Sequence, residues 1–362
     1  MKPQPASVDM DLNHESTHNH YASTLTSAMA YYQSLSSVTT GWRPVSMPPS
    51  GSKFPVHIAK RTVPGKTTEV VRGTALIKGK EFALDDWKAV LECTGARKIW
   101  DKFVESSSML ETLNPNTRIT RTILKTGWPK SQRDLVVIEN TMIEDDKVLF
   151  IATSIPSTSN DPVFLRKAPN YIRANLDLMA ICIETVTKSP ADNGSLSELG
   201  MVIHKALQVT VYYQVDLKGW KSSSSVALQS PLCINEIYSY LNDFGVPPHV
   251  FRYGKWIQVN QNDYHHEDRL FELSYSVVEI DDIDASNFGS KGSSSGSELD
   301  LDDIIEISID GERWCSGNVQ AHISVNGKED PQFVQDCVEC FKHPGIMMGS
   351  LVMIGFPSAD QS

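Results

Sequence analysis

The stretch from Val209 to Trp220 constrains the fold of this chain more than any other short segment. An extended strand has a two-residue period, and here one face is apolar and the other carries amphipathic groups. The two faces are Val209, Val211, Tyr213 and Val215 against Thr210, Tyr212, Gln214 and Asp216. Gly219 then frees the chain to turn. We therefore expect a long strand in a sheet curved around a ligand, with Thr210, Tyr212 and Gln214 as candidate wall residues.

Charge excludes one broad class of partner. The formal net charge is −11, whereas nucleic acid requires clustered Lys and Arg. A local basic patch between Lys98 and Lys130 remains compatible with brief contact to a membrane surface. We expect no nucleic-acid partner and only transient contact with membranes.

Cysteine content and hydropathy indicate the compartment. The six cysteines are too sparse for a disulfide scaffold, which favours a reducing environment. The N-terminus lacks the apolar core of a signal peptide, and no run approaches about 18 apolar residues. The sequence predicts a cytoplasmic protein that can be peripheral at membranes.

Composition divides the chain into four parts. Residues 1–52 are rich in Ser, Thr, Pro, Asn and His, which predicts a mostly disordered tail. Residues 53–280 carry the strand and helix patterns of the main domain. Residues 281–303 form an acidic Gly/Ser-rich linker, and residues 304–362 a small β-rich region of unknown role.

Within the main domain, strands and helices alternate in an α+β pattern. The strongest hairpin joins residues 135–143 to 148–155 through a polar turn. A helix follows Pro231, which suits a first helical position, and an apolar stripe runs along it. The stripe consists of Ile234, Ile237, Tyr238 and Leu241.

Four separated motifs occur in a recognisable order. They are Arg97-Lys98-Ile99-Trp100-Asp101, Arg133-Asp134-Leu135-Val136, Tyr171-Ile172-Arg173-Ala174 and Asp216-Leu217-Lys218-Gly219-Trp220. Over about residues 54–245, and up to 280, the chain resembles the START family, the steroidogenic-acute-regulatory-related lipid-transfer domains. The resemblance implies a helix-grip fold, in which a curved antiparallel sheet wraps a long C-terminal helix around an internal apolar cavity.

The resemblance also implies a function. A START domain encloses one lipid, such as a phospholipid, a sterol or a related molecule, and exchanges it at membranes. The expected protein is a monomer without a cofactor, and the apolar stripe of the last helix serves as its lid. Ile234, Ile237, Tyr238 and Leu241 are therefore candidate ligand contacts.

One polar position departs from the family pattern. Many members carry an arginine six residues after the first Arg of the Arg-Asp motif, with an acid on the preceding strand. Here the position is Glu139, and the preceding strand offers Arg121 as a cation of swapped polarity. A buried carboxylate requires a partner, so Glu139 and Arg121 are candidate ligand residues. Arg173 is a further candidate, against the alternative of a solvent-facing row of polar side chains.

No motif for catalysis was found. The sequence lacks a recognisable nucleophile with its base, and it lacks a phosphate-binding loop. Cys337-x-x-Cys340 with His343 falls short of a zinc site because no fourth ligand is evident. We expect no enzymatic activity and no metal. Two alternatives stay open: an enzyme of the same superfold with Glu139 as acid or base, and a lipid-sensing adaptor protein.

Overall fold

The computed structural model shows two compact units, Met1–Asp243 and Phe244–Ser362. It describes residues 9–46, 53–78, 82–125, 131–157, 162–188, 204–219, 223–253, 257–268, 270–277, 304–310, 324–325, 328–329, 338–342 and 349–355. The first unit contains all the predicted site residues.

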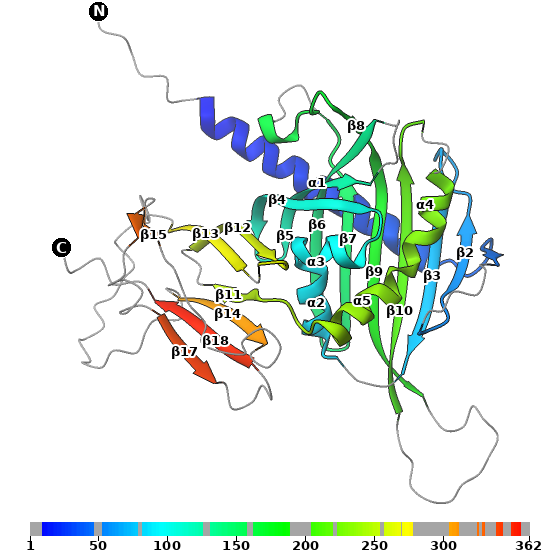
Figure 1. The fold of residues 1–362 in the computed structure, drawn as a ribbon. Coiled ribbons are helices and arrows are strands. Elements are labelled where there is room, and N and C mark those ends of the chain that lie inside the picture. The colour runs from blue at the N-terminus through cyan, green and yellow to red at the C-terminus, as the bar shows by residue number, and fades with distance from the viewer. Residues whose placement is uncertain are drawn as a thin grey trace, which may run out of the picture. The chain divides into compact units, whose positions relative to one another are not determined.

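A ten-stranded sheet forms the centre of the first unit (Figure 1). Its order is β1-β2-β3-β10-β9-β7-β6-β5-β4, and β8 pairs with β6 outside this path. The strands are β1 (Arg43–Val45), β2 (His57–Arg61), β3 (Val70–Ile77), β4 (Val104–Asn114), β5 (Thr117–Leu124), β6 (Gln132–Glu144), β7 (Lys147–Ser154), β8 (Tyr171–Arg173), β9 (Asn175–Lys188) and β10 (His204–Asp216). All pairs along the path are antiparallel, and the predicted β6–β7 hairpin is confirmed, with Glu144 opposite Lys147.

Helices cover both faces of this sheet. In Figure 1, α2, α3, α4 and α5 lie on the near side, and α1 runs behind the strands. The helices and 3₁₀ turns are α1 (Asp9–Ser36), α2 (Leu84–Glu92), α3 (Thr94–Trp100), η1 (Val163–Leu165), α4 (Ser223–Gln229), η3 (Ser230–Leu232) and α5 (Cys233–Asp243). We call the face toward α2, α3 and α5 the inner face and the face toward α1 the outer face.

The alternation predicted for residues 209–216 assigns neighbouring side chains to these two faces. Tyr213 lies beside Ser230 and Cys233, which follow α4. Tyr212 instead packs against Tyr32 of α1, with ring centroids 5.7 Å apart. The α+β class and the antiparallel sheet are therefore confirmed, and the two-residue period decides which helix each residue meets.

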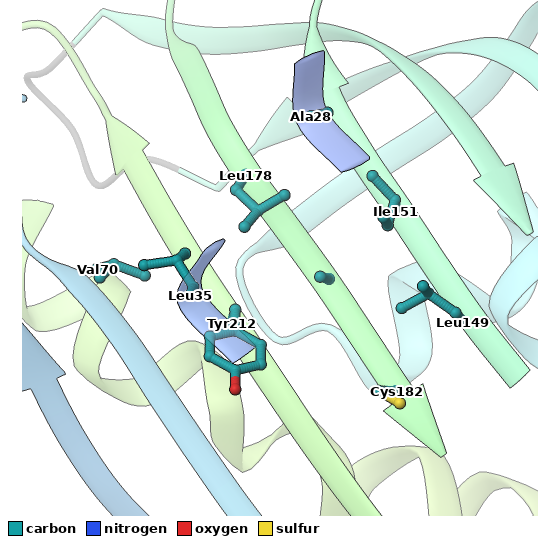
Figure 2. Packing of buried hydrophobic residues seen from close by; sticks show 9 residues of the cluster. Ala28, Leu35, Val70, Leu149, Ile151, Leu178, Cys182 and Tyr212 are labelled. Carbon is teal, nitrogen blue, oxygen red and sulfur yellow. The ribbon is translucent and has the colours of Figure 1, made fainter. Parts of the chain in front are cut away.

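The N-terminal segment differs from the predicted disordered tail. Helix α1 is 28 residues long. Its residues Tyr21, Ala28 and Leu35 are buried, each with at most 5% of its surface exposed. Figure 2 shows Ala28 near Ile151, and Leu35 beside Val70 and Tyr212, in one buried cluster with Leu178. The composition of the helix is polar overall, and its few apolar residues become a core stripe only because the sheet offers an apolar outer face.

The single long C-terminal helix that the fold class implied is not observed. Its place is taken by α4, the turn η3 and α5, which has 11 residues. Pro231 lies in the turn, where its missing N–H and its ring oppose a continuous helix. The turn lies so close to β3 that a Cβ atom on Gly73 would overlap the Pro231 ring. Glycine at position 73 therefore permits this close approach.

The second unit is β-rich and begins at Phe244. Its strands are β11 (His249–Tyr253), β12 (Ile257–His265), β13 (Leu270–Val277), β14 (Ile304–Asp310), β15 (Ser324–Val325), β16 (Lys328–Glu329), β17 (Val338–Lys342) and β18 (Gly349–Gly355). Strand β11 pairs with β14, around a small core that includes Ile257, Ile305 and Ile307. Residues 249–277, which we had predicted to belong to the main domain, thus fall in the second unit. The predicted linker at 281–303 lies outside the described residues.

Candidate ligand site

A buried carboxylate, Glu139 of β6, lies on the inner face. Its side chain is 2% exposed and is contacted by two guanidinium groups. Arg97 donates from Nη1 to Oε1 at 2.7 Å, and Arg118 donates from Nε to Oε2 at 3.0 Å. The Thr120 hydroxyl also donates to Oε1, at 2.8 Å. The carboxylate that the sequence placed in the domain interior is therefore fully paired.

Three elements bring these residues together. Arg118 lies directly opposite Glu139 in the β5–β6 register, so both side chains point to the same face. Thr120 is two residues further along β5 and shares that face. Arg97 comes from the last turn of α3, a helix that begins where the Cys93 sulfur accepts a hydrogen bond from the Ala96 amide.

The charges of this cluster hold Glu139 ionised. Burial alone would raise the pKa of its carboxyl, but Arg118, Arg97 and the Thr120 hydroxyl outweigh burial, so the pKa lies below its usual value. Asp101 behaves in the opposite way. Burial raises the pKa of its carboxyl, and the attraction of Arg97 offsets only part of that effect.

The lowered pKa of Glu139 predicts a pH dependence. A carboxyl with a depressed folded-state pKa contributes stability above the unfolded value, about 4.3, and loses it as the pH falls through the folded value. The difference in unfolding free energy between the wild type and Glu139→Gln should therefore be largest near pH 7 and shrink below about pH 4. Urea unfolding at pH 7, 5 and 3.5 measures it. The exposed Glu144→Gln serves as the control, and a Glu139→Gln difference that stays constant with pH would contradict the assignment.

Some hydrogen-bond donors beside this cluster are unused. Among the described residues, neither Nε of Arg97 nor Nε1 of Trp100 has a hydrogen-bond partner, although both atoms are buried. The Arg97 guanidinium lies 5.9 Å from the centroid of the Trp100 ring. Because an unsatisfied buried donor is costly, these two groups are suited to an oxygen atom of a bound molecule.

The prediction that Arg121 pairs with Glu139 is wrong. Arg121 lies opposite Val136 in the register and points to the outer face. There its Nη2 is 3.1 Å from a carboxylate oxygen of Asp134, a residue with no exposed surface. Its guanidinium carbon is 5.0 Å from the Tyr171 ring centroid. Arg121 comes three positions after Arg118, and an odd offset along a strand puts the two side chains on opposite faces of β5.

Arg173 joins Arg121 on the outer face. It binds Asp134 through two hydrogen bonds of 3.0 Å and donates to the backbone oxygens of Leu165 and Arg166. It is therefore not part of a solvent-facing row, since most of its donors are engaged in holding a loop. The structure does not bring Arg121 or Arg173 to Glu139.

The three predicted wall residues of β10 also face outward. Gln214 accepts a hydrogen bond of 2.6 Å from the Tyr31 hydroxyl and donates to the Thr68 oxygen. Tyr212 packs against Tyr32 and Trp42. Thr210 follows the same alternation. The N-terminal segment therefore covers Tyr212 and Gln214. The apolar face of the same strand points to the other side of the sheet, where Tyr213 lies beside Ser230 and Cys233.

The stripe on α5 is buried, as its pattern predicted. Ile234, Ile237 and Leu241 have no exposed surface, and Tyr238 is 2% exposed. The Tyr238 ring meets Phe54 and Phe82 edge to face, with centroids 4.8 and 5.5 Å apart. Asn235 exchanges two hydrogen bonds with the backbone of Phe54. These contacts fasten α5 to the segments that precede β2 and α2.

A polar cavity of about 380 Å³ lies on the outer face, between α1 and the sheet. It is lined by His20, Ser23, Thr24, Ser27, Ala28, Tyr31, Lys66, Thr153, Ser154, Pro156, Asn175, Leu176 and Asp177. Lys66 lies 2.6 Å from Asp177 within this lining. The internal apolar cavity expected next to α5 stays a prediction.

Two residues of the Glu139 cluster were missed as site residues by the sequence analysis. Arg97 was noted only as part of a motif, and Arg118 only as part of a basic stretch. The sequence did contain a signal for Arg118: it lies two positions before Thr120, so both side chains point to the same face of the strand that precedes Glu139. No group of three or more His, Cys, Asp or Glu residues suited to a metal was found in the part of the chain that the structure describes. Cys337 and His343 lie outside that part.

Comparison with known proteins assigns the domain. The START domain family matches residues 62–227. These residues form a START domain. A START domain supports a lipid-binding or lipid-transfer role in the broad sense, and the Glu139 cluster lies within the matched range. No helix among the described residues is long and apolar enough to cross a membrane.

Comparison with solved structures returns proteins with related names. Human StAR-related lipid transfer protein 5 is 17% identical, with a TM-score of 0.45, and the match covers 63% of this chain and 97% of that one. Human STARD10 is 15% identical, with a TM-score of 0.44 and coverage of 59% and 78%. A STAR-related lipid transfer protein from Xanthomonas axonopodis is 17% identical, with a TM-score of 0.39 and coverage of 56% and 99%. A search of curated proteins found no match.

Proposed function

We propose that this START protein takes up one lipid between the inner face of the sheet and the helices α2, α3 and α5, and exchanges it at membrane surfaces. The observation that carries the proposal is the Glu139 cluster, a polar island with spare buried donors on an otherwise apolar face of a START domain. In this proposal the chain acts as a monomer in the cytoplasm, without a cofactor.

The inner face is suited to hydrocarbon. On the central strands it presents fully buried apolar side chains, among them Phe150, Ile181, Ile183 and Val211. Each methylene group removed from water stabilises the complex by about 0.8 kcal/mol, so a lipid chain gains strongly from such an enclosure. Apolar walls alone would accept any chain, and the polar island adds a requirement for an oxygen-bearing group.

The polar end of the lipid belongs at the Glu139 cluster. Nε of Arg97 and Nε1 of Trp100 are donors, so the group that they fit is an acceptor, such as a hydroxyl, ester or carbonyl oxygen. The carboxylate itself is satisfied by Arg97, Arg118 and Thr120 and acts as the support that fixes the guanidinium groups.

Helix α5 is the element proposed to open. It is short, it is separated from α4 by the turn at Pro231, and its apolar side is buried. A shift of α5 would uncover Ile234, Ile237, Tyr238 and Leu241, which then contact the lipid as it enters. On the outer side of β10, Tyr212 and Gln214 contribute by holding α1 through Tyr32 and Tyr31, and Thr210 shares their face.

An enzymatic role for Glu139 is disfavoured by its surroundings. Two guanidinium groups and the Thr120 hydroxyl hold the pKa of its carboxyl low, which makes it a weak base, and as an acid it would already be deprotonated at neutral pH. The proposed protein therefore carries its lipid unchanged. Native mass spectrometry followed by solvent extraction tests this: one unmodified lipid per chain is expected, and no binding across a broad lipid panel would refute the proposal.

The polar island gives a sharper test. Thr120→Val removes one of the hydrogen bonds that hold Glu139, and we expect about fivefold weaker retention of the extracted lipid, the effect of one hydrogen bond. Thr153→Val is the matched control, because Thr153 also donates hydrogen bonds but lies on the outer face. The lipid-bound fraction in native mass spectra measures both variants. Equal retention by the two would show that the Glu139 cluster does not contact the lipid.

A further inference from the structure

An exposed apolar turn with basic neighbours follows β7. We call residues 162–167 the Val163 turn; it contains η1 and ends in Arg166 and Lys167, both exposed. The Val163 side chain is 76% exposed, the largest exposure among the big apolar residues of the described chain. An exposed apolar side chain beside two cations is typical of a surface that binds another molecule.

The turn is held firmly by the structure beneath it. Leu165 is buried in a cluster with Tyr21 of α1, Ile119, Val136 and Ile138. Arg173 donates to the backbone oxygens of Leu165 and Arg166, at 3.1 and 3.3 Å. Val163 is therefore presented to solvent by a fixed turn, with little conformational entropy left to lose on binding.

Positive charge gathers below the turn. Arg173 and Arg121 both bind the single carboxylate of Asp134, which leaves an excess of one cation there. Arg121 is 27% exposed, so this charge is open to solvent. In sequence, one acid, Asp161, precedes the turn and two cations end it. The region is locally basic on a chain whose net charge is −11, so it would be attracted to a negative surface while most of the protein is not.

We propose that the Val163 turn docks on anionic phospholipid membranes, a role that rests on the proposed lipid exchange. Val163 would enter the headgroup layer, and Arg166 and Lys167 would contact lipid phosphates, with Arg121 adding to the attraction. One valine and a few cations give weak, reversible binding, which is what a carrier that leaves each membrane requires. A protein partner of opposite charge is the competing occupant, and the test separates the two.

The test compares two variants that carry the same kinds of change. The docking variant is Val163→Asp with Arg166→Gln and Lys167→Gln. The control variant is Ile143→Asp with Lys147→Gln, on the β6–β7 hairpin, where Ile143 is 42% exposed. Co-sedimentation is measured with vesicles of phosphatidylcholine alone and with one third phosphatidylserine, and near-ultraviolet circular dichroism confirms that the variants are folded.

Wild-type protein should bind the vesicles containing phosphatidylserine more tightly, and added salt should weaken that binding. The affinity of the docking variant for these vesicles should be at least about 25-fold lower than that of the wild type, because each of the two removed cations contributes about fivefold. The control variant should bind as the wild type does. Equal losses in the two variants, or wild-type protein that ignores phosphatidylserine, would overturn the proposal and leave a protein partner as the occupant of the turn.

Lipid occupancy, measured on the same samples by native mass spectrometry, separates this proposal from the proposed function. A docking variant that keeps its lipid but loses vesicle binding supports both. Wild-type protein that carries a lipid but does not bind vesicles refutes docking alone. Vesicle binding through the turn by a protein that holds no lipid supports docking and refutes the carrier role.

Discussion

Replacing Glu139 by alanine should lower the free energy of unfolding by about 3–5 kcal/mol, the effect of breaking a buried ion pair. The variant leaves the guanidinium groups of Arg97 and Arg118 in the interior with their shared carboxylate removed. Their side chains are only 7% and 11% exposed, so water cannot readily replace the carboxylate. Urea unfolding followed by circular dichroism measures the loss.

Two further variants make this prediction specific. Glu144→Ala removes a carboxylate of the same strand that is 61% exposed, and it should change the unfolding free energy by less than about 0.5 kcal/mol. The double variant Arg97→Met with Glu139→Leu should recover part of the loss, because it removes one of the two stranded guanidinium groups together with the carboxylate. A Glu139→Ala loss no larger than that of Glu144→Ala would show that the cluster is not buried as described.

Removing helix α1 should also destabilise the domain strongly. Deletion of residues 1–36 takes Tyr21, Ala28 and Leu35 out of the core and exposes the outer face beneath them. At about 1.5–3 kcal/mol for each large buried side chain, the loss is about 5 kcal/mol. For a unit of this size that corresponds to a melting temperature lower by about 10–20 °C. Differential scanning calorimetry of the two proteins measures it.

Point variants separate packing from the effect of a shorter chain. Leu35→Ala should lower the free energy of unfolding by about 2–5 kcal/mol, as buried leucines do. The neighbouring exposed Ser34→Ala is the control and should have almost no effect. An unchanged melting temperature after the deletion would restore the disordered tail that composition alone suggests.

Local sequence patterns predicted the strands correctly but predicted disorder where helix α1 forms, because a strand shows its period locally whereas this helix depends on packing. Strand β10 shows its period within eight residues, so its apolar and polar faces can be read from residues 209–216. Helix α1 has little amphipathic pattern, and its Ser and Thr side chains satisfy themselves on the helix backbone, as Thr24 does on His20. Its stability comes from packing, which a composition argument does not contain.

The alternation of side chains along a strand explains why a partner for Glu139 was predicted correctly but the wrong arginine was chosen. The sequence required a partner for a carboxylate in the domain interior, and the structure provides two. It did not give the β5–β6 register, which pairs Arg118 with Glu139 and turns Arg121 toward Asp134. A shift of one residue would have exchanged the two arginines between the faces.

The sequence by itself therefore determined the α+β class, the two faces of the central strands, the START motifs and the need to pair Glu139. Only the tertiary structure decided which helix covers each face, since both faces of this sheet are packed and the alternation does not distinguish them. It assigned Tyr212 and Gln214 to α1, and Arg97 and Arg118 to the polar island. The physical reason is that a local period fixes the direction of a side chain, whereas the partner it meets is brought there by strand register and helix packing from distant parts of the chain.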